Sequence, residues 1–107
     1  MSVVIVVPGQ EDWFISGRGY RLLKERADGL LDGEADREVL YLGGLHGLFF
    51  DSLPHEQARR LALAVQRAAE SLRFELRRSS DGRDQEFAEH LERLALSLTE
   101  LAGTGEE

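Results

Sequence analysis

Residues 54–78, PHEQARRLALAVQRAAESLRFELRR, carry the longest regular apolar pattern of the chain. Apolar side chains recur there at steps of four and three residues, the spacing that places side chains on one face of an α-helix. Ser52 and Pro54 stand where such a helix begins, because serine hydroxyls cap helix N-termini and proline is tolerated in the first turn. The stretch therefore predicts a long helix with one apolar seam. The seam consists of Ala58, Ala62, Val65, Ala69, Leu72 and Leu76.

A second helix with a matching seam is expected after residues 79–82 (SSDG), which interrupt the first pattern. It runs over about residues 83–102, and Gly103 is suited to end it, because glycine readily adopts the conformation of a helix C-cap. Two seams of similar length joined by a short turn predict an antiparallel helical hairpin over residues 52–102. The second seam consists of Phe87, Leu91, Leu94, Leu98 and Leu101.

The N-terminal residues carry the signals of β-strands. Residues 3–7 (VVIVV) are β-branched throughout, which favours extended backbone. Because every position is apolar rather than every second one, we expect this strand to be covered on both faces, inside a sheet or across a dimer interface. Residues 13–15 (WFI) predict a second strand that forms a hairpin with the first.

A helix and a third strand are expected next. Ser16 is a suitable N-cap for a helix over about residues 18–31, and Gly33 is a natural stop. Residues 32–38 are rich in acids and are expected to form a loop. Residues 39–42 (VLYL) could be a strand or a helical turn, and we favour a strand, because two glycines end it and the first strand needs neighbours. The buried face of the helix is expected to consist of Tyr20, Leu23, Ala27 and Leu30.

These elements predict a single α+β domain, predominantly helical, in which a small N-terminal β-sheet packs on a long C-terminal antiparallel helical hairpin. Residues 1–44 form the strand and helix half, residues 52–102 form the hairpin, and residues 103–107 are a polar tail that frays. A chain of 107 residues is long enough to bury a core of its own. Its 42% of apolar and 31% of charged residues are ordinary for a folded domain.

Composition excludes several classes of function. The chain has no cysteine, so it forms no disulfide and uses no thiol nucleophile or cysteine-ligated metal. Its net charge of −7 argues against a nucleic acid partner and fits a basic protein partner. The longest apolar runs hold five residues, whereas a membrane span needs about 20. The first ten residues contain no basic residue, unlike a signal peptide, and we expect a cytoplasmic protein without a membrane partner.

Two apolar residues lie off the seam of the long helix. Leu63 and Phe74 are eleven residues apart, about three helical turns, so they stack on the side opposite the seam. Residues 54–80 contain six arginines and three glutamates, and apolar anchors ringed by arginine resemble the centre of a protein interface. This pattern predicts a partner-binding strip. One alternative is a solvent-exposed helix face with weak local ion pairs, on which arginine stems could cover both anchors; the other is that both anchors lie under the sheet. The arginines of the strip are Arg59, Arg60, Arg67, Arg77 and Arg78.

Residues 46–55 hold the densest set of polar groups with chemical potential. Asp51 lies between His46 and His55, and a carboxylate with two imidazoles could bind a divalent metal or form an acid–base pair. Their spacing matches no helical metal motif, and Asp51 could instead cap the following helix. We keep these three residues as a possible pocket, and we expect no metal and no cofactor.

The segment before them, residues 43–50 (GGLHGLFF), is both glycine-rich and apolar. It could be a mobile wall of a pocket, or a compact turn that inserts its side chains into the core. We favour the second interpretation. The inserted side chains would be Leu48, Phe49 and Phe50.

The sequence predicts function only as a class. It contains no Walker-type phosphate loop, no complete dinucleotide fingerprint and no nucleophile elbow. We therefore expect a non-catalytic protein–protein interaction module, either a homodimer or an inhibitor- or immunity-type protein that covers a basic partner. The alternative is a small enzyme or ligand-binding domain that uses the pocket of His46, Asp51 and His55.

Overall fold

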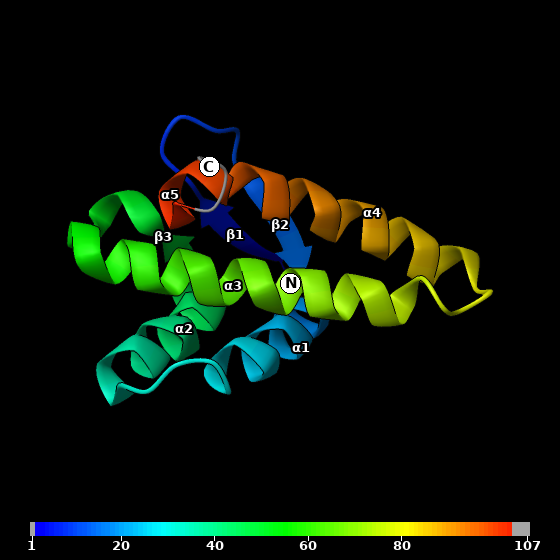
Figure 1. Ribbon diagram of the computed structural model, residues 1–107, viewed down its shortest axis with the longest axis horizontal. Coiled ribbons are helices and arrows are strands. Elements are labelled where there is room, and N and C mark those ends of the chain that lie inside the picture. The colour runs from blue at the N-terminus through cyan, green and yellow to red at the C-terminus, as the bar shows by residue number, and fades with distance from the viewer. Residues whose placement is uncertain (1, 104–107) are drawn as a thin grey trace.

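A long helical hairpin forms the front of the molecule (Figure 1). In this computed structural model, which describes residues 2–103, helices α3 (His55–Leu76) and α4 (Gly82–Ser97) pack against each other and are joined by a short turn. The seam of α3 is buried except at its last residue, Leu76, which is half-buried. On the second helix, Leu91 and Leu94 are fully enclosed. The predicted antiparallel hairpin is confirmed.

The start of α3 differs from the prediction. Ser52 does not cap the helix, because its hydroxyl donates to the Phe49 carbonyl (3.0 Å) within a short 3₁₀ helix, η1 (Phe50–Ser52). Pro54 occupies the N-cap position, and no side chain supplies a capping hydrogen bond there. The fixed backbone of proline, rather than a hydroxyl, sets the beginning of this helix.

The second helix is interrupted near its end. It was expected to continue to residue 102, but α4 ends at Ser97 and a single further turn, α5 (Thr99–Ala102), follows. Gly103 ends α5 with a φ of 74°, as predicted. The remainder of the expected tail, residues 104–107, lies outside the described residues.

The sheet has the strand order β2-β1-β3. Strand β1 (Ser2–Val6) pairs antiparallel with β2 (Trp13–Ser16), which confirms the predicted hairpin. On its other side β1 pairs in parallel with β3 (Leu48–Phe49), which has only two residues. The third strand is therefore not formed by residues 39–42.

Helix α1 (Gly17–Asp28) begins as expected and ends early. The hydroxyl of Ser16 accepts a hydrogen bond from the backbone N–H of Gly19 (3.0 Å), which confirms the N-cap. Because the helix stops at Asp28 instead of continuing to residue 31, Leu30 is exposed rather than buried. Leu31 enters the core in its place.

The predicted strand over residues 39–42 lies inside a helix, α2 (Glu34–His46), and most of the expected acidic loop forms the first turns of that helix. Acidic side chains in the first turn stabilise a helix N-terminus. The hydroxyl of Tyr20 donates to the Leu40 carbonyl (2.6 Å), and Leu40 is buried. The strand preference of a short apolar run is weak, and packing of this segment against α1 overrides it.

The helices cover one face of the sheet and leave the other open (Figure 1). Along β1, Val4 and Val6 alternate with the buried Val3 and Ile5, so they belong to the open face, where they are half-buried. Strand β1 therefore lies inside the sheet, as predicted, but the single chain covers its second face only in part. The buried residues on the inner face are Val3, Ile5, Trp13, Ile15 and Leu48.

Two adjacent glycines in α2 test the contact between α1 and α2. A Cβ at Gly43 would lie 2.6 Å from the Tyr20 hydroxyl oxygen, whereas a Cβ at Gly44 would come no closer than 3.4 Å to the Tyr20 ring. We expect the free energy of unfolding of Gly43→Ala to be about 1–3 kcal/mol below that of Gly44→Ala, because a buried tyrosine must move. Both variants gain the same helix propensity, so chemical denaturation of the pair isolates the contact. Equal stabilities would contradict this packing.

Candidate interaction surface

The open side of the sheet carries an apolar cluster, here named the outer face, which consists of Val4, Val6, Phe14 and Phe49. In the strand register Val4 lies opposite Phe14 and Val6 opposite Phe49, so the four side chains stand on the same side of the sheet. Phe14 is 56% exposed and Phe49 is 39% exposed. Sheets with one face in water usually place polar residues there. The outer face departs from that rule and presents two aromatic rings to solvent.

A glycine turn brings Phe49 to the outer face. Gly47, between α2 and β3, has a φ of 99°, a conformation that favours glycine. A Cβ at this position would lie 2.8 Å from the Phe49 ring and 2.9 Å from a Val4 methyl group, so both side chains pack against the turn. Leu48 and Phe50 insert into the core as predicted, and Phe49 does not.

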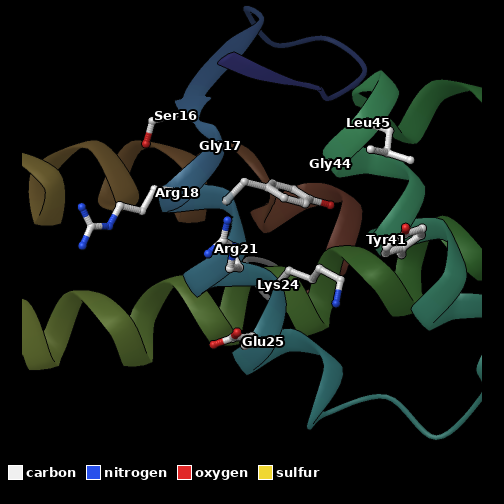
Figure 2. A pocket seen from close by; sticks show the side chains of 10 residues that line it. Ser16, Gly17, Arg18, Arg21, Lys24, Glu25, Tyr41, Gly44 and Leu45 are labelled. Carbon is white, nitrogen blue, oxygen red and sulfur yellow. The ribbon is translucent and has the colours of Figure 1, made fainter. Parts of the chain in front are cut away.

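A cationic groove lies beside the end of β2 (Figure 2). It is an open hollow of about 690 Å³ between α1 and α2, lined from α1 by Arg18, Arg21 and Lys24. Ser16 also lines the groove and is the last residue of β2, so the groove begins where that strand ends. The α2 side of the groove consists of Tyr41, Gly44 and Leu45.

Part of the positive charge of the groove is not neutralised within the chain. Lys24 forms an ion pair with Asp28 (2.7 Å). Glu25 adds one negative charge to the lining. Arg18 and Arg21 are exposed, and neither forms an ion pair in the part of the chain that the structure describes. These two guanidinium groups are available to an acidic group from outside.

Tyr20 forms part of the groove floor and is a structural group. Burial, with a smaller contribution from the charge of Asp28, raises the pKa of Tyr20 above its usual value. The phenol therefore stays neutral and keeps its hydrogen bond to the Leu40 carbonyl. A tyrosine held in this state does not act as an acid or base near neutral pH.

The free edge of β2 is partly occupied by α4. The indole N–H of Trp13 donates to the His90 carbonyl (3.1 Å), and the two rings stack with centroids 4.3 Å apart. Nε2 of His90 donates to the carbonyl of Phe14. An edge strand whose backbone acceptor is already bonded is protected against pairing with a strand of another chain.

The structure separates the two anchors of the predicted partner-binding strip. Leu63 is half-buried, packs against the core and lies beside the connection between α1 and α2. Phe74 is 70% exposed. This exposure rules out burial of Phe74 under the sheet, and it fits both a partner-binding strip and a plain solvent-exposed helix face. Whether this strip binds a partner stays a prediction.

The arginines of the strip differ in their surroundings. Arg60 forms an ion pair with Asp36 of α2 (2.9 Å), and Arg77 forms one with Glu92 of α4 (3.1 Å). Contacts between helices therefore neutralise part of the strip. The members without an ion pair among the described residues are Arg59, Arg67 and Arg78.

The three residues of the possible pocket lie at the end of α2, in η1 and at the start of α3, and all three are exposed. Within residues 2–103, no hydrogen bond or ion pair joins His46, Asp51 and His55. His55 instead lines a hollow of about 270 Å³ whose other residues come from the two ends of the chain. A role for the three residues as a pocket stays a prediction.

The residues that the structure describes contain neither a metal-binding cluster nor a helix that could span a membrane. Between residues 2 and 103, no group of three histidine, aspartate or glutamate side chains has an arrangement suited to a metal ion. None of the helices in that range has both the length and the apolar character that crossing a bilayer requires.

The ion pair of Arg60 with Asp36 joins α3 to α2, and its contribution to stability depends on pH. The hydrogen bond from the Arg60 guanidinium holds the pKa of the Asp36 carboxyl below its usual value, against the opposing effect of burial, and Gln57 donates to the same carboxyl. A carboxyl whose pKa is lowered by folding stabilises the protein above its unfolded pKa of about 4, and this contribution is lost as the pH falls.

We therefore expect Arg60→Gln to be less stable than the wild type at pH 7, with the difference shrinking below about pH 4. Chemical denaturation between pH 2 and 7 measures it. Arg78→Gln is the matched control, because Arg78 forms no ion pair among the described residues, and its stability should differ little from wild type throughout. A difference for Arg60→Gln that does not change with pH would contradict the assignment.

Comparison of the chain with family models, with curated proteins and with solved structures finds no match.

Proposed function

We propose that this protein is a non-catalytic protein–protein interaction module and that the outer face of its sheet is the binding surface. The observation that supports this most is the pair of exposed rings, Phe14 and Phe49, beside the half-buried Val4 and Val6 on the sheet face that the helices leave open. Contiguous exposed apolar groups of this kind mark interaction sites. Aromatic side chains at the centre of an interface contribute most of its binding energy.

The surroundings of the outer face suit an interface as well. Ser2 and Ser16 lie opposite each other at one end of the sheet, and the loop before β2 carries Glu11 and Asp12 at the other. Both ends are exposed. A polar, solvated rim around an apolar centre is the usual anatomy of a protein interface.

Two classes of partner fit this proposal: a second copy of the chain, and a basic protein covered by an inhibitor- or immunity-type module. The net charge of −7 supports the second class through long-range attraction. We further propose that binding takes place in the cytoplasm and involves no nucleic acid, because the chain is acidic and contains no cysteine that an oxidising compartment would pair.

The double variant Phe14→Thr/Phe49→Thr tests the proposal, because threonine removes the rings and keeps a strand preference. We expect its affinity for the partner, measured by titration of the purified partner or by self-association, to fall at least about thirty-fold, as loss of a central aromatic anchor does. Circular dichroism of the variant checks that the fold survives.

Phe74→Gln is the matched control, since it removes an exposed ring, in this case from α3. It should bind as the wild type does. Binding that survives in the double variant and is lost in Phe74→Gln would move the interface to the strip of Leu63 and Phe74. A wild-type chain that assembles neither with itself nor with another protein would contradict the function.

A further inference from the structure

We infer that the occupant of the outer face is a second copy of this chain, packed face to face about a twofold axis that runs across the strands. In this arrangement Glu11 and Asp12 of each copy meet Arg18 and Arg21 of the other. The inference rests on the proposed function and goes beyond it by naming the partner and its orientation.

The charges flanking β2 support this orientation. Two exposed acids, Glu11 and Asp12, directly precede the strand, and Arg18 follows it after one residue, with Arg21 one helical turn further on. None of the four forms an ion pair in residues 2–103. One end of the outer face is therefore negative and the other, at the cationic groove, is positive.

A twofold axis that runs across the strands brings opposite charges together at both ends of the outer face. It places the two β2 strands antiparallel to each other in facing sheets, which pack about 10 Å apart. The strand has four residues, so its ends are separated by about 10 Å. The acidic end of each copy then lies over the basic end of the other. Reciprocal contacts of this kind define an interface between identical subunits.

Other partners match the charges and the strand edges of the outer face less well. A basic partner would be attracted by Glu11 and Asp12 but repelled by Arg18 and Arg21. An acidic partner would be attracted by the two arginines but repelled by the two acids. Partner chains that add a strand are disfavoured too, because His90 occupies the Phe14 carbonyl on the β2 edge and β3 offers only two residues. A second copy brings apolar side chains to the centre and the correct charge to each end.

The aromatic rings and the charged residues contribute differently to the proposed interface. The exposed rings of Phe14 and Phe49 supply apolar contact, as anchors do. Ion pairs at an exposed rim add little affinity and mainly fix orientation, whereas like charges placed opposite each other weaken binding strongly. Charge reversal is therefore a sharper test of the orientation than charge removal.

Two charge-reversed variants test the inference: Arg18→Glu/Arg21→Glu, with acids at both ends, and Glu11→Arg/Asp12→Arg, with bases at both ends. Sedimentation equilibrium measures self-association of each variant alone and of their equimolar mixture. We expect the wild type to form a dimer, each variant alone to associate at least about tenfold more weakly, and the mixture to recover wild-type association as a heterodimer.

The control is Arg59→Glu/Arg78→Glu, which changes the net charge by the same amount on α3 and breaks no ion pair of the described residues. It should dimerise as the wild type does. Dimers lost in this control and retained in the first two variants would overturn the inference, as would a mixture that fails to associate.

The outcomes also separate the inference from the proposed function. A wild type that is monomeric, together with another protein whose binding depends on Phe14 and Phe49, would overturn the self-association and leave the function standing. A dimer that persists in Phe14→Thr/Phe49→Thr would show that the outer face is not the interface, and both would fail.

Discussion

The contact between the small side chains of α3 and the leucines of the following helices is the interaction on which the other elements depend. Ala62, Ala68 and Ala69 of α3 have no exposed area, and neither have Leu91, Leu94 and Leu98. Enclosing each leucine contributes about 1.5–3 kcal/mol, and alanine lets the helix axes approach closely. Because α1, α4 and α5 all pack on α3, the helices gather into one layer.

One layer of helices can cover only one face of a sheet. The inner face, with Ile5 and Leu48, is closed by that layer, whereas Phe14 and Phe49 on the other side remain in solvent. The chain does not compensate with polar residues at the centre of the outer face, so the same packing that completes the core leaves an apolar surface. In the proposed dimer, a partner sheet covers this surface in the way that sheets pack in β-sandwiches.

The sequence was sufficient where local periodicity and packing agree, and insufficient where distant contacts decide. The seams of the hairpin repeat over many turns, and the N-cap at Ser16 and the stop at Gly103 need only neighbouring residues. Residues 39–42 carry a strand-like run that the contact of Tyr20 with Leu40 turns into helix, and no local pattern reveals that contact. The outer face did have a signal, the unbroken apolar run of residues 3–7, but a sequence does not say whether its own chain or another covers the second face.

Solvent accessibility of the phenylalanine rings, measured by NMR with an inert paramagnetic agent on the assembled protein, tests the central claim that the outer face is covered by a partner chain. The account predicts that the agent broadens the ring signals of Phe14 and Phe49 only weakly in the assembled sample and strongly after dilution. The ring signals of Phe74 are broadened equally in the assembled and the diluted sample. Equal accessibility of all three rings in the assembled sample would contradict it.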